Sequence, residues 1–376
     1  MEFRDLKAQY SKLKDDIDSR VLSVMSHGKY INGPEVKELE KQLAEYVGVK
    51  HCITCGNGTD ALMLVLKAWG IGKGDCVFVP DFTFFASAEV ISLVGATPIF
   101  VDVDPRTFNI DPEKLVEMIS KVKAEGNYDL KAVIAVDLFG LPADYEKLEA
   151  ICKLNNLKLL EDGAQGFSGR IGDRYNCSFG DAATTSFFPA KPLGCYGDGG
   201  AIFTNDVDLE KLIRSYAVHG KGEDKYDNVR IGVNSRLDTI QASILLSKFE
   251  ALKTYEWVDT NNAANYYTEL LKDYVEVPYI PENFYSGWAQ YTIKLKDTET
   301  RDKVSSKLKE KGIPTMVYYK KPMHLQTAFN NLPYYEEELK VSTELCDQVL
   351  SLPLSPYISK EEIKKVADAI IEAINE

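Results

Sequence analysis

The chain has 376 residues, enough for two domains that share an interface. Its composition, 45% hydrophobic and 27% charged, predicts a packed core and not a disordered chain. A net charge of −13 argues against nucleic acid as the main partner, because phosphate backbones bind to cationic faces. It leaves room for a small anionic substrate, because a pocket can be locally cationic.

The sequence predicts no membrane span. Residues 1–7 lack an apolar signal core, and the longest apolar runs, such as residues 132–136, are far too short to cross a bilayer. The seven cysteines show no disulfide spacing, so we expect reduced thiols and a cytoplasmic protein. Cys52 and Cys55 form a Cys-x-x-Cys pair without a second pair of ligands. We expect them to be strand cysteines, and we expect no metal site.

Between about residues 35 and 208, short apolar runs alternate with helical segments. The runs predict strands at residues 51–54, 76–79, 97–101, 132–136, 157–160, 183–187 and 200–204. Amphipathic stretches between them predict helices at residues 59–69, 85–93, 111–122 and 145–154. This alternation is typical of an α/β fold with a mostly parallel central sheet covered by helices on both faces.

A helix-rich passage from residue 235 to about residue 271 leads to a smaller α+β part. There we expect strands at residues 290–294 and 315–319 and helices at residues 300–311 and 360–375. The sequence therefore predicts a large domain of residues 1–250, with an N-terminal arm, and a small domain of residues 251–376. We expect a long helix to connect them, near residues 245–275.

Four predicted strands end in residues that could carry chemistry. In an open α/β sheet, ligands bind beyond the carboxyl ends of the strands. Residues 55–60 follow the first strand as a glycine-rich turn, and residues 80–85 follow the second with aromatic rings. Residues 161–165 follow the fifth strand with carboxylates, and residues 189–194 follow the sixth with a lysine. A phosphate cradle, a ring, a carboxylate and a lysine are the groups that pyridoxal phosphate needs.

Each of these groups has a physical reason to bind the cofactor, and each also has an ordinary structural explanation. A turn that leads into a helix offers free N–H groups to a phosphate; Gly58 allows close approach, and Thr59 adds a hydroxyl. Asp162 can pair with a protonated pyridine nitrogen and keep the ring electron-poor. Phe84 can cover one face of a planar ring. Taken singly, the turn and Asp162 could be helix caps, and Phe84 could be a core residue.

Lys191 gives the most specific signal. It lies between Pro189 and Pro192, before the glycine-rich residues 194–200, so the segment is a rigid loop and not a helix. An apolar, rigid loop desolvates the ammonium and favours the neutral amine that forms a Schiff base. A solvated surface lysine is the alternative, but the Pro-x-Lys-Pro-x-Gly frame favours catalysis.

Several motifs resemble those of the DegT/DnrJ/StrS sugar aminotransferases. The matching segments extend over nearly the whole chain: residues 3–7, 33–36, 161–165, 186–194, 197–201 and 234–242. The resemblance implies an aspartate-aminotransferase-like (fold type I) homodimer that binds pyridoxal 5'-phosphate, or pyridoxamine phosphate when aminated. It also implies amino transfer from glutamate to a nucleotide-linked keto-sugar, for a surface polysaccharide such as lipopolysaccharide.

The resemblance also assigns roles to single residues. Lys191 is the catalytic residue and forms the internal aldimine, Gln165 lies near the ring hydroxyl, and Asn234 reaches the phosphate from the partner subunit. The full set of expected cofactor-binding residues is Gly58, Thr59, Asp60, Phe84, Asp162, Gln165, Ser186, Lys191 and Asn234.

The substrate is less closely defined. Residues 187–200 most resemble enzymes that act on UDP-2-acetamido-2-deoxy-3-oxo-glucuronate, in which a His-Tyr pair stands at Tyr318-Tyr319 and helps to hold the sugar carboxylate. Tyr318 can donate a hydrogen bond but carries no positive charge. Arg236 could clamp a carboxylate or a diphosphate, and we expect Tyr318, Tyr319 and His324 to join it at the substrate. A UDP-linked 3-keto-N-acetylhexosamine, its uronate, and a GDP- or dTDP-linked 6-deoxy keto-sugar all stay open.

Other functions fit the motifs less well. Sugar dehydratases on this fold replace the reactive lysine by histidine, whereas Lys191 is present. A nicotinamide oxidoreductase needs Gly-x-Gly-x-x-Gly after a strand, and the nearest run, residues 70–74, follows a helix. A non-catalytic regulator that binds the cofactor has no need for both Lys191 and Asp162.

Overall fold

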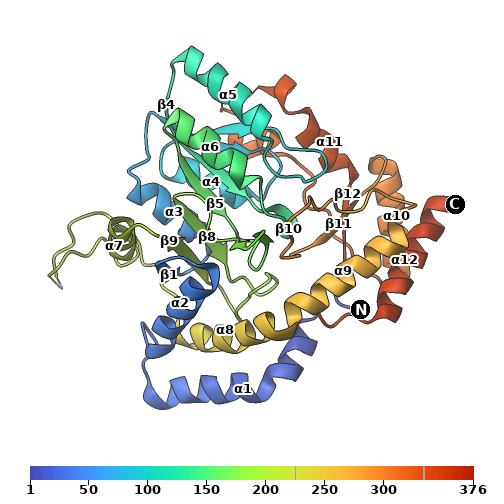
Figure 1. The fold of residues 1–376 in the computed structure, drawn as a ribbon, viewed down its shortest axis with the longest axis horizontal. Helices are drawn as coiled ribbons and strands as arrows, with labels where there is room; N and C mark the ends of the chain where they lie inside the picture. Colours follow the sequence, from blue (N-terminus) through green and yellow to red (C-terminus); the bar gives the residue numbers. More distant parts are fainter. Residues whose placement is uncertain (225, 333–334) are drawn as a thin grey trace.

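A seven-stranded sheet forms the centre of the larger part of the chain in the computed structural model, which describes residues 1–224, 226–332 and 335–376 (Figure 1). The strand order is β1-β9-β8-β5-β4-β2-β3. The strands are β1 (His51–Cys55), β2 (Asp75–Pro80), β3 (Thr97–Val101), β4 (Asp129–Val136), β5 (Lys158–Asp162), β8 (Ala182–Ser186) and β9 (Gly200–Thr204). Only β9 runs antiparallel to its neighbours in this sheet. The α/β fold class and all seven predicted strands are confirmed.

Successive strand residues point to opposite faces of the sheet, and each face has its own helical layer. Val77 and Val79 of β2 belong to the core with α3, α4 and α7, whereas Cys76 and Phe78 belong to the core with α5 and α6. Near β1 and β9, this second face is covered by α2 and α8. The helices are α2 (Pro34–Val47), α3 (Gly58–Ala68), α4 (Phe85–Leu93), α5 (Pro112–Glu125), α6 (Tyr145–Asn155), α7 (Val207–Tyr216) and α8 (Thr239–Ala251).

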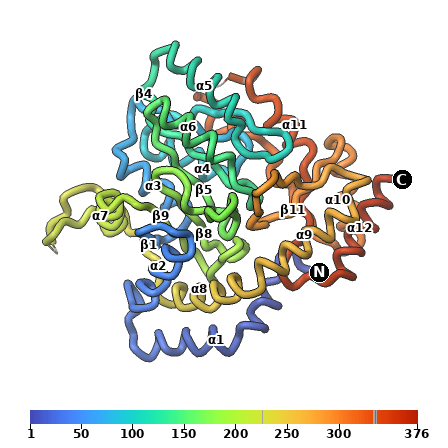
Figure 2. The backbone as a smooth tube through the Cα atoms, viewed as in Figure 1, coloured from blue at the N-terminus to red at the C-terminus, as the bar shows by residue number. Residues whose placement is uncertain are grey.

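The N-terminal arm contacts both the large and the small part of the chain. Helix α1 (Leu6–His27) begins after Asp5, whose side chain accepts a hydrogen bond from Ala8 N at 2.8 Å, and it lies along α8 (Figure 2). The residues before α1 reach the C-terminal part of the chain, where Leu354 N donates to Phe3 O at 3.1 Å.

An unbroken helical stretch leads from the sheet to the smaller part. It consists of α8, η2 (Leu252–Glu256) and α9 (Trp257–Leu271). There, α9, α10 (Thr298–Glu310) and α12 (Lys360–Asn375) share one core with the antiparallel pair β11 (Tyr291–Lys294) and β12 (Val349–Leu352). The helices and the strand predicted near residues 290–294, 300–311 and 360–375 are confirmed. The strand predicted at residues 315–319 is wrong, because only Met316 forms a bridge, to Ser351, before the chain turns away.

The boundary at residue 250 stays a prediction, since it falls within this helical stretch.

Helix α11 (Lys340–Gln348) belongs to the large part although it lies late in the chain, because its Leu345 and Cys346 pack into the core of α3 and α4. The remaining small sheet joins β10 (Phe284–Tyr285), β6 (Arg170–Ile171) and β7 (Arg174–Tyr175).

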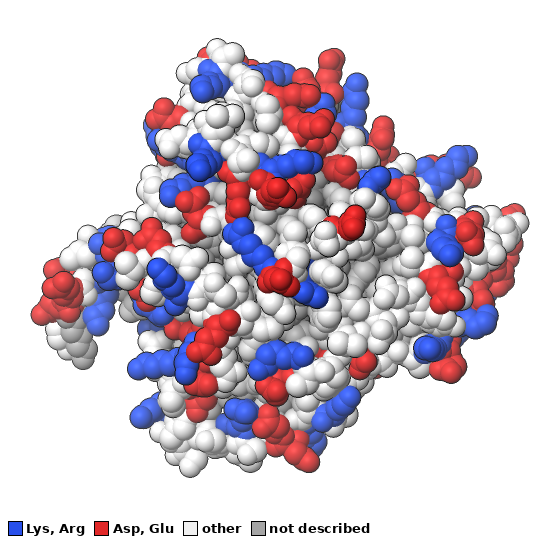
Figure 3. Space-filling model, in the orientation of Figure 1, with Lys and Arg blue, Asp and Glu red and all other residues white. Residues whose placement is uncertain are grey.

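The surface carries both signs of charge. Acidic and basic side chains are interspersed over the face in Figure 3. None of the helices in the described part of the chain is long and apolar enough to cross a membrane.

Candidate active site

A cavity of about 620 Å³ lies at the carboxyl ends of β1, β2, β4, β5 and β8. It is the place where the sequence predicted a ligand. The predicted residues that line it are Gly58, Thr59, Asp60, Phe84, Asp162, Gln165, Ser186, Lys191, Tyr318 and Tyr319.

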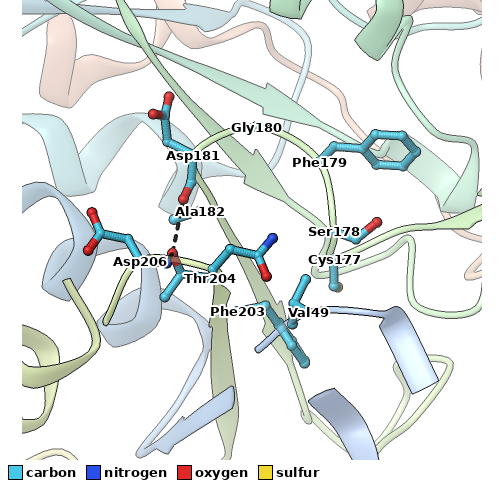
Figure 4. Close-up of a pocket in the computed structure, with 11 residues that line it drawn as sticks. Val49, Cys177, Ser178, Phe179, Gly180, Asp181, Ala182, Phe203, Thr204 and Asp206 are labelled. Carbon is cyan, nitrogen blue, oxygen red and sulfur yellow. Dashed lines mark hydrogen bonds between the residues drawn. The ribbon is translucent and has the colours of Figure 1, made fainter. Parts of the chain in front are cut away.

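A second hollow, of about 250 Å³, lies at the opposite end of the sheet, where β8 begins and β9 ends (Figure 4). Its polar groups are bonded within the fold. The Thr204 hydroxyl donates to Asp181 O at 3.1 Å, the Asp181 carboxylate pairs with Lys158, and the Asp206 side chain caps α7. None of its described lining residues is a lysine, arginine or histidine. The cavity at the carboxyl ends is therefore the candidate active site.

The start of α3 forms one wall of this cavity and is suited to an anion. Asn57 caps the helix, with its side chain accepting from Asp60 N at 2.8 Å. The N–H groups of Gly58 and Thr59 come first in the helix and have no intrahelical acceptor. A Cβ at Gly58 would lie 2.8 Å from the Ser186 Cβ, so glycine permits this close approach. The free N–H groups, the helix dipole and the hydroxyls of Thr59 and Ser186 can together hold a phosphate.

Asp60 connects this wall to a later segment of the chain. Its Oδ2 accepts from the Ser235 hydroxyl at 2.6 Å, and the same hydroxyl accepts from Gly56 N at 2.9 Å. The segment that carries Asn234 and Arg236 is thereby attached to the glycine-rich turn.

Asp162 ends β5 as a buried carboxylate with two hydrogen-bond donors. Ser87 Oγ donates to its Oδ2 at 2.7 Å, and Ala164 N donates to its Oδ1 at 3.2 Å. Burial raises the pKa of Asp162, and the two hydrogen bonds and the positive charge of Lys191 oppose that rise. Ser87 belongs to no motif, so this contact could not be predicted from the sequence.

Lys191 is a half-buried cavity residue in the loop after β8. Burial lowers the pKa of its amine to about 8; Asp162 opposes this shift by attraction, and Arg4 adds to it by repulsion. A backbone hydrogen bond from Lys191 N to Phe188 O, at 2.9 Å, fixes the loop. A larger share of the amine is therefore neutral near pH 8 than in a solvated lysine, which favours its use as a nucleophile.

Gln165 joins the end of β5 to the segment that carries Tyr319. Its Oε1 accepts from Phe139 N at 2.7 Å, and its Nε2 donates to the Tyr319 hydroxyl at 3.0 Å, which leaves one Nε2 hydrogen for a ligand. The Phe84 ring is 53% exposed, with its centroid 6.2 Å from that of Tyr319. An exposed ring at the cavity wall can stack on a planar ligand.

Three predicted site residues lie outside the cavity of their own chain. His324 is buried: its Nδ1 lies 2.7 Å from Asp81 Oδ2, and its N donates to Asp81 Oδ1 at 2.8 Å. These contacts fasten the segment after Tyr319 to the end of β2, which does not favour contact with a substrate. Asn234 is exposed and Arg236 is half-buried.

Some cavity residues were not predicted. Thr83, Ser87, Asp198 and Gln290 line it. Gln290 Oε1 is buried without a hydrogen-bond partner among the described residues, so it can accept from a ligand. Its position at the edge of a predicted strand carried no functional signal.

Nearly the whole chain is similar to known proteins. The model of the DegT/DnrJ/EryC1/StrS aminotransferase family matches residues 11–371. The chain is 44% identical over 370 residues to the UDP-2-acetamido-2-deoxy-3-oxo-D-glucuronate aminotransferase of Pseudomonas aeruginosa, covering 98% of this chain and 99% of that protein. It is 42% identical over 372 residues to a pleiotropic regulatory protein of Geobacillus stearothermophilus, covering 98% and 97%. The crystal structure of a DegT DnrJ EryC1 StrS aminotransferase from Brucella abortus matches with a TM-score of 0.97 and 47% identity, over 100% of both chains.

Proposed function

This chain belongs to the DegT/DnrJ/EryC1/StrS aminotransferase family, and from that membership we propose that it transfers an amino group from glutamate to a UDP-linked 3-keto-sugar. It is an aminotransferase of fold type I that depends on pyridoxal phosphate. The observation that supports the proposed site is the meeting of the Lys191 amine, the Asp162 carboxylate and the open start of α3 at Gly58 in one cavity.

The cavity fits the cofactor group by group. We propose that the phosphate binds at the start of α3, where glycine at position 58 permits a close approach to Ser186 that a Cβ would prevent. Phe84 would cover one face of the ring, Asp162 would pair with its nitrogen and Gln165 would contact its hydroxyl, and all three line the cavity. Thr59 and Asp60 complete this wall. Bound pyridoxal phosphate supplies an electron-poor ring that withdraws electrons from the reacting carbon.

Each protein group has a defined task in this proposal. The Asp162 carboxylate, whose two hydrogen bonds oppose the effect of burial on its charge, would keep a proton on the pyridine nitrogen. The Lys191 amine, with its pKa lowered to about 8, would be the nucleophile that holds the cofactor. Its Nζ could also serve as the general base and acid that moves a proton during amino transfer.

We propose a homodimer whose two active sites are shared. Asn234 and Arg236 lie outside the cavity of their own chain, on either side of Ser235, which is attached to the glycine-rich turn. In a symmetric dimer, the partner's cavity could face this segment, where Asn234 would meet the partner's phosphate and Arg236 its substrate. Arg236 suits a diphosphate or a carboxylate equally well.

The substrate proposal rests on the similarity to the Pseudomonas enzyme and on the part of the cavity that Tyr318 and Tyr319 line. We propose a UDP-linked 3-keto-N-acetylhexosamine or its uronate, bound beside Tyr318 and Tyr319. The product would serve a surface polysaccharide such as lipopolysaccharide, and the enzyme would act in the cytoplasm, where nucleotide sugars and reduced thiols are found.

A pair of measurements tests this function. The purified protein should be yellow, and its cofactor absorbance should bleach when glutamate is added. The aminated protein should then convert a UDP-linked 3-keto-sugar in preference to GDP- and dTDP-linked 6-deoxy keto-sugars, each followed by the mass shift of the sugar. Preference for a 6-deoxy sugar would support the alternative substrate class.

A regulator that binds the cofactor is the second candidate, because one relative bears the name of a regulatory protein. The retained pair of Lys191 and Asp162 favours an enzyme. If glutamate bleached the protein and no keto-sugar of any nucleotide restored the absorbance, the regulatory function would be favoured.

A further inference from the structure

Gln290 brings an amide with an unpaired oxygen to the candidate active site. It stands directly before β11 and is one of the residues that line the cavity. Its Oε1 is shielded from solvent and receives no hydrogen bond from a described residue. Leaving a buried amide oxygen unpaired is unfavourable, so a ligand that donates to it would form a hydrogen bond that the free protein lacks.

The position of Gln290 is fixed by the same loop that holds Gln165. Gln290 N donates to Phe139 O at 3.3 Å, and Phe139 N donates to Gln165 Oε1 at 2.7 Å. Gln165 Nε2 in turn donates to the Tyr319 hydroxyl at 3.0 Å. Phe139 therefore connects Gln290 to the side of the cavity that Gln165 and Tyr319 form.

This side of the cavity is polar without being charged. Among the described residues, the charged side chains that line the cavity all come from the large part: Asp60, Asp162, Lys191 and Asp198. The small part contributes Gln290, Tyr318 and Tyr319. A neutral amide suits a neutral polar group, because neither partner gives up the hydration of a charge. The polar groups of glutamate are all charged near neutral pH, whereas a keto-sugar presents neutral hydroxyls.

We propose that the side-chain amide of Gln290 binds a hydroxyl group of the keto-sugar. This inference rests on the proposed function and adds a specificity-determining residue to it. A hydroxyl both donates and accepts hydrogen bonds, so it can pair with the amide through Oε1 or through Nε2. A site built around such a hydrogen bond rejects an analogue without the hydroxyl more strongly than an apolar pocket rejects an added group.

The two half-reactions of the holoenzyme separate a contact with the sugar from a structural role. One is amination of the bound cofactor by glutamate, and the other is transfer of that amino group to whichever keto-sugar the wild type converts best. Both are followed by the cofactor absorbance. Gln290→Met removes the amide and keeps an unbranched side chain. Gln348→Met is the matched control: Gln348 is a half-buried glutamine directly before β12 that donates to Lys296 O at 3.3 Å and lies outside the cavity.

We expect Gln290→Met to lower kcat/KM for the keto-sugar by about tenfold or more, the scale of losing one hydrogen bond and leaving its partner unpaired. The rate with glutamate should stay within about twofold of the wild-type value, and Gln348→Met should change neither half-reaction. Gln290→Asn, which keeps the amide on a shorter chain, should give a smaller loss and serves if the methionine variant folds poorly.

Analogues without a keto group identify the hydroxyl. Calorimetry compares the binding of UDP-N-acetylglucosamine with that of its 4-deoxy and 6-deoxy forms, in the wild type and in Gln290→Met. In the wild type, loss of the recognised hydroxyl should raise the Kd by about tenfold. In the variant the same loss should change the Kd by less than about twofold, because the amide that the hydroxyl pairs with is already gone. An effect of the 4-deoxy form assigns the hydroxyl beside the keto carbon, and an effect of the 6-deoxy form assigns the hydroxymethyl group.

An equal slowing of both half-reactions by Gln290→Met would overturn the proposal and make Gln290 a structural residue. Unchanged rates in both, or deoxy effects as large in the variant as in the wild type, would overturn it as well. The wild-type response to glutamate and to the keto-sugars tests the proposed function separately. If no keto-sugar were converted, the comparison of the deoxy analogues would still decide whether Gln290 binds a hydroxyl.

Discussion

Ser87 Oγ donates a hydrogen bond to Asp162 Oδ2 across 2.7 Å and connects α4 to the carboxyl end of β5. The contact is buried, and Thr83 Oγ1 lies 3.2 Å from the same serine oxygen. Because the Asp162 carboxylate is desolvated, its charge depends on such donors. Ser87 is therefore a positioning residue that acts through Asp162.

Ser87→Ala should reduce kcat/KM by about tenfold, and more at pH 6 than at pH 8. A hydrogen bond to the charged form lowers a pKa, so its loss raises the pKa of Asp162 and leaves less carboxylate at low pH. The measurement is the pH profile of kcat/KM. Thr83→Val is the control, because it removes a hydroxyl that does not contact Asp162. An equal reduction at every pH would show that Ser87 does not act through the charge of Asp162.

Asp162→Asn should keep the cofactor bound while turnover falls by at least about a hundredfold. The amide cannot hold the pyridine nitrogen protonated, whereas the proposed phosphate contacts at α3 are untouched. Cofactor content by absorbance and turnover with a keto-sugar are the two readouts. A change of less than threefold would make Asp162 a structural residue.

Lys191→Ala should abolish turnover without unfolding the protein. No second lysine lines the cavity in the described part of the chain, and a rigid loop tolerates a smaller side chain. Borohydride should fix the cofactor covalently in the wild type and not in the variant, as mass spectrometry of the intact chains would reveal. Normal turnover by the variant would contradict the proposed role of Lys191.

The seven strands of the central sheet could be predicted from the sequence, because strands buried on both faces are continuous apolar runs with helices between them. It placed a false strand at residues 315–319, where Tyr318 and Tyr319 turn toward the cavity instead of pairing. The predicted site residues at strand ends converge, since parallel strands deliver their carboxyl ends to one edge. Ser87 and Gln290 could not be predicted as site residues, because tertiary packing alone brings them to the cavity. His324 was placed at the substrate by its nearness in sequence to Tyr319, but its ring points to Asp81.

In cofactor-free protein, covalent attachment of pyridoxal phosphate should accelerate as the pH rises through about 8. The neutral amine is the nucleophile, and burial lowers the pKa of Lys191 to that value from the usual 10.5. Asp162 attracts the ammonium and raises this pKa, so Asp162→Asn should move the inflection to lower pH. Stopped-flow absorbance over pH 6–10 measures both profiles. An inflection near 10 in the wild type would mean that Lys191 is solvated.

Mixed dimers test whether Asn234 acts on the partner's cofactor. In the proposed dimer, one subunit with Lys191→Ala and another with Asn234→Asp form one doubly damaged site and one intact site. The intact site takes its lysine from the second subunit and its asparagine from the first. Each homodimer should have little activity, since Asn234→Asp sets a negative charge against the phosphate, whereas the mixed dimer should regain about half of the wild-type turnover.

The mixed dimer can be isolated with two different affinity tags and assayed beside both parents. Because Asn234 is exposed in the single chain, the substitution should leave the melting temperature of the subunit unchanged. If Asn234 served the cavity of its own chain, both sites of the mixed dimer would be damaged and no activity would return. Full activity of the Asn234→Asp parent would instead show that this residue does not reach a phosphate, and the shared site would then rest on Arg236.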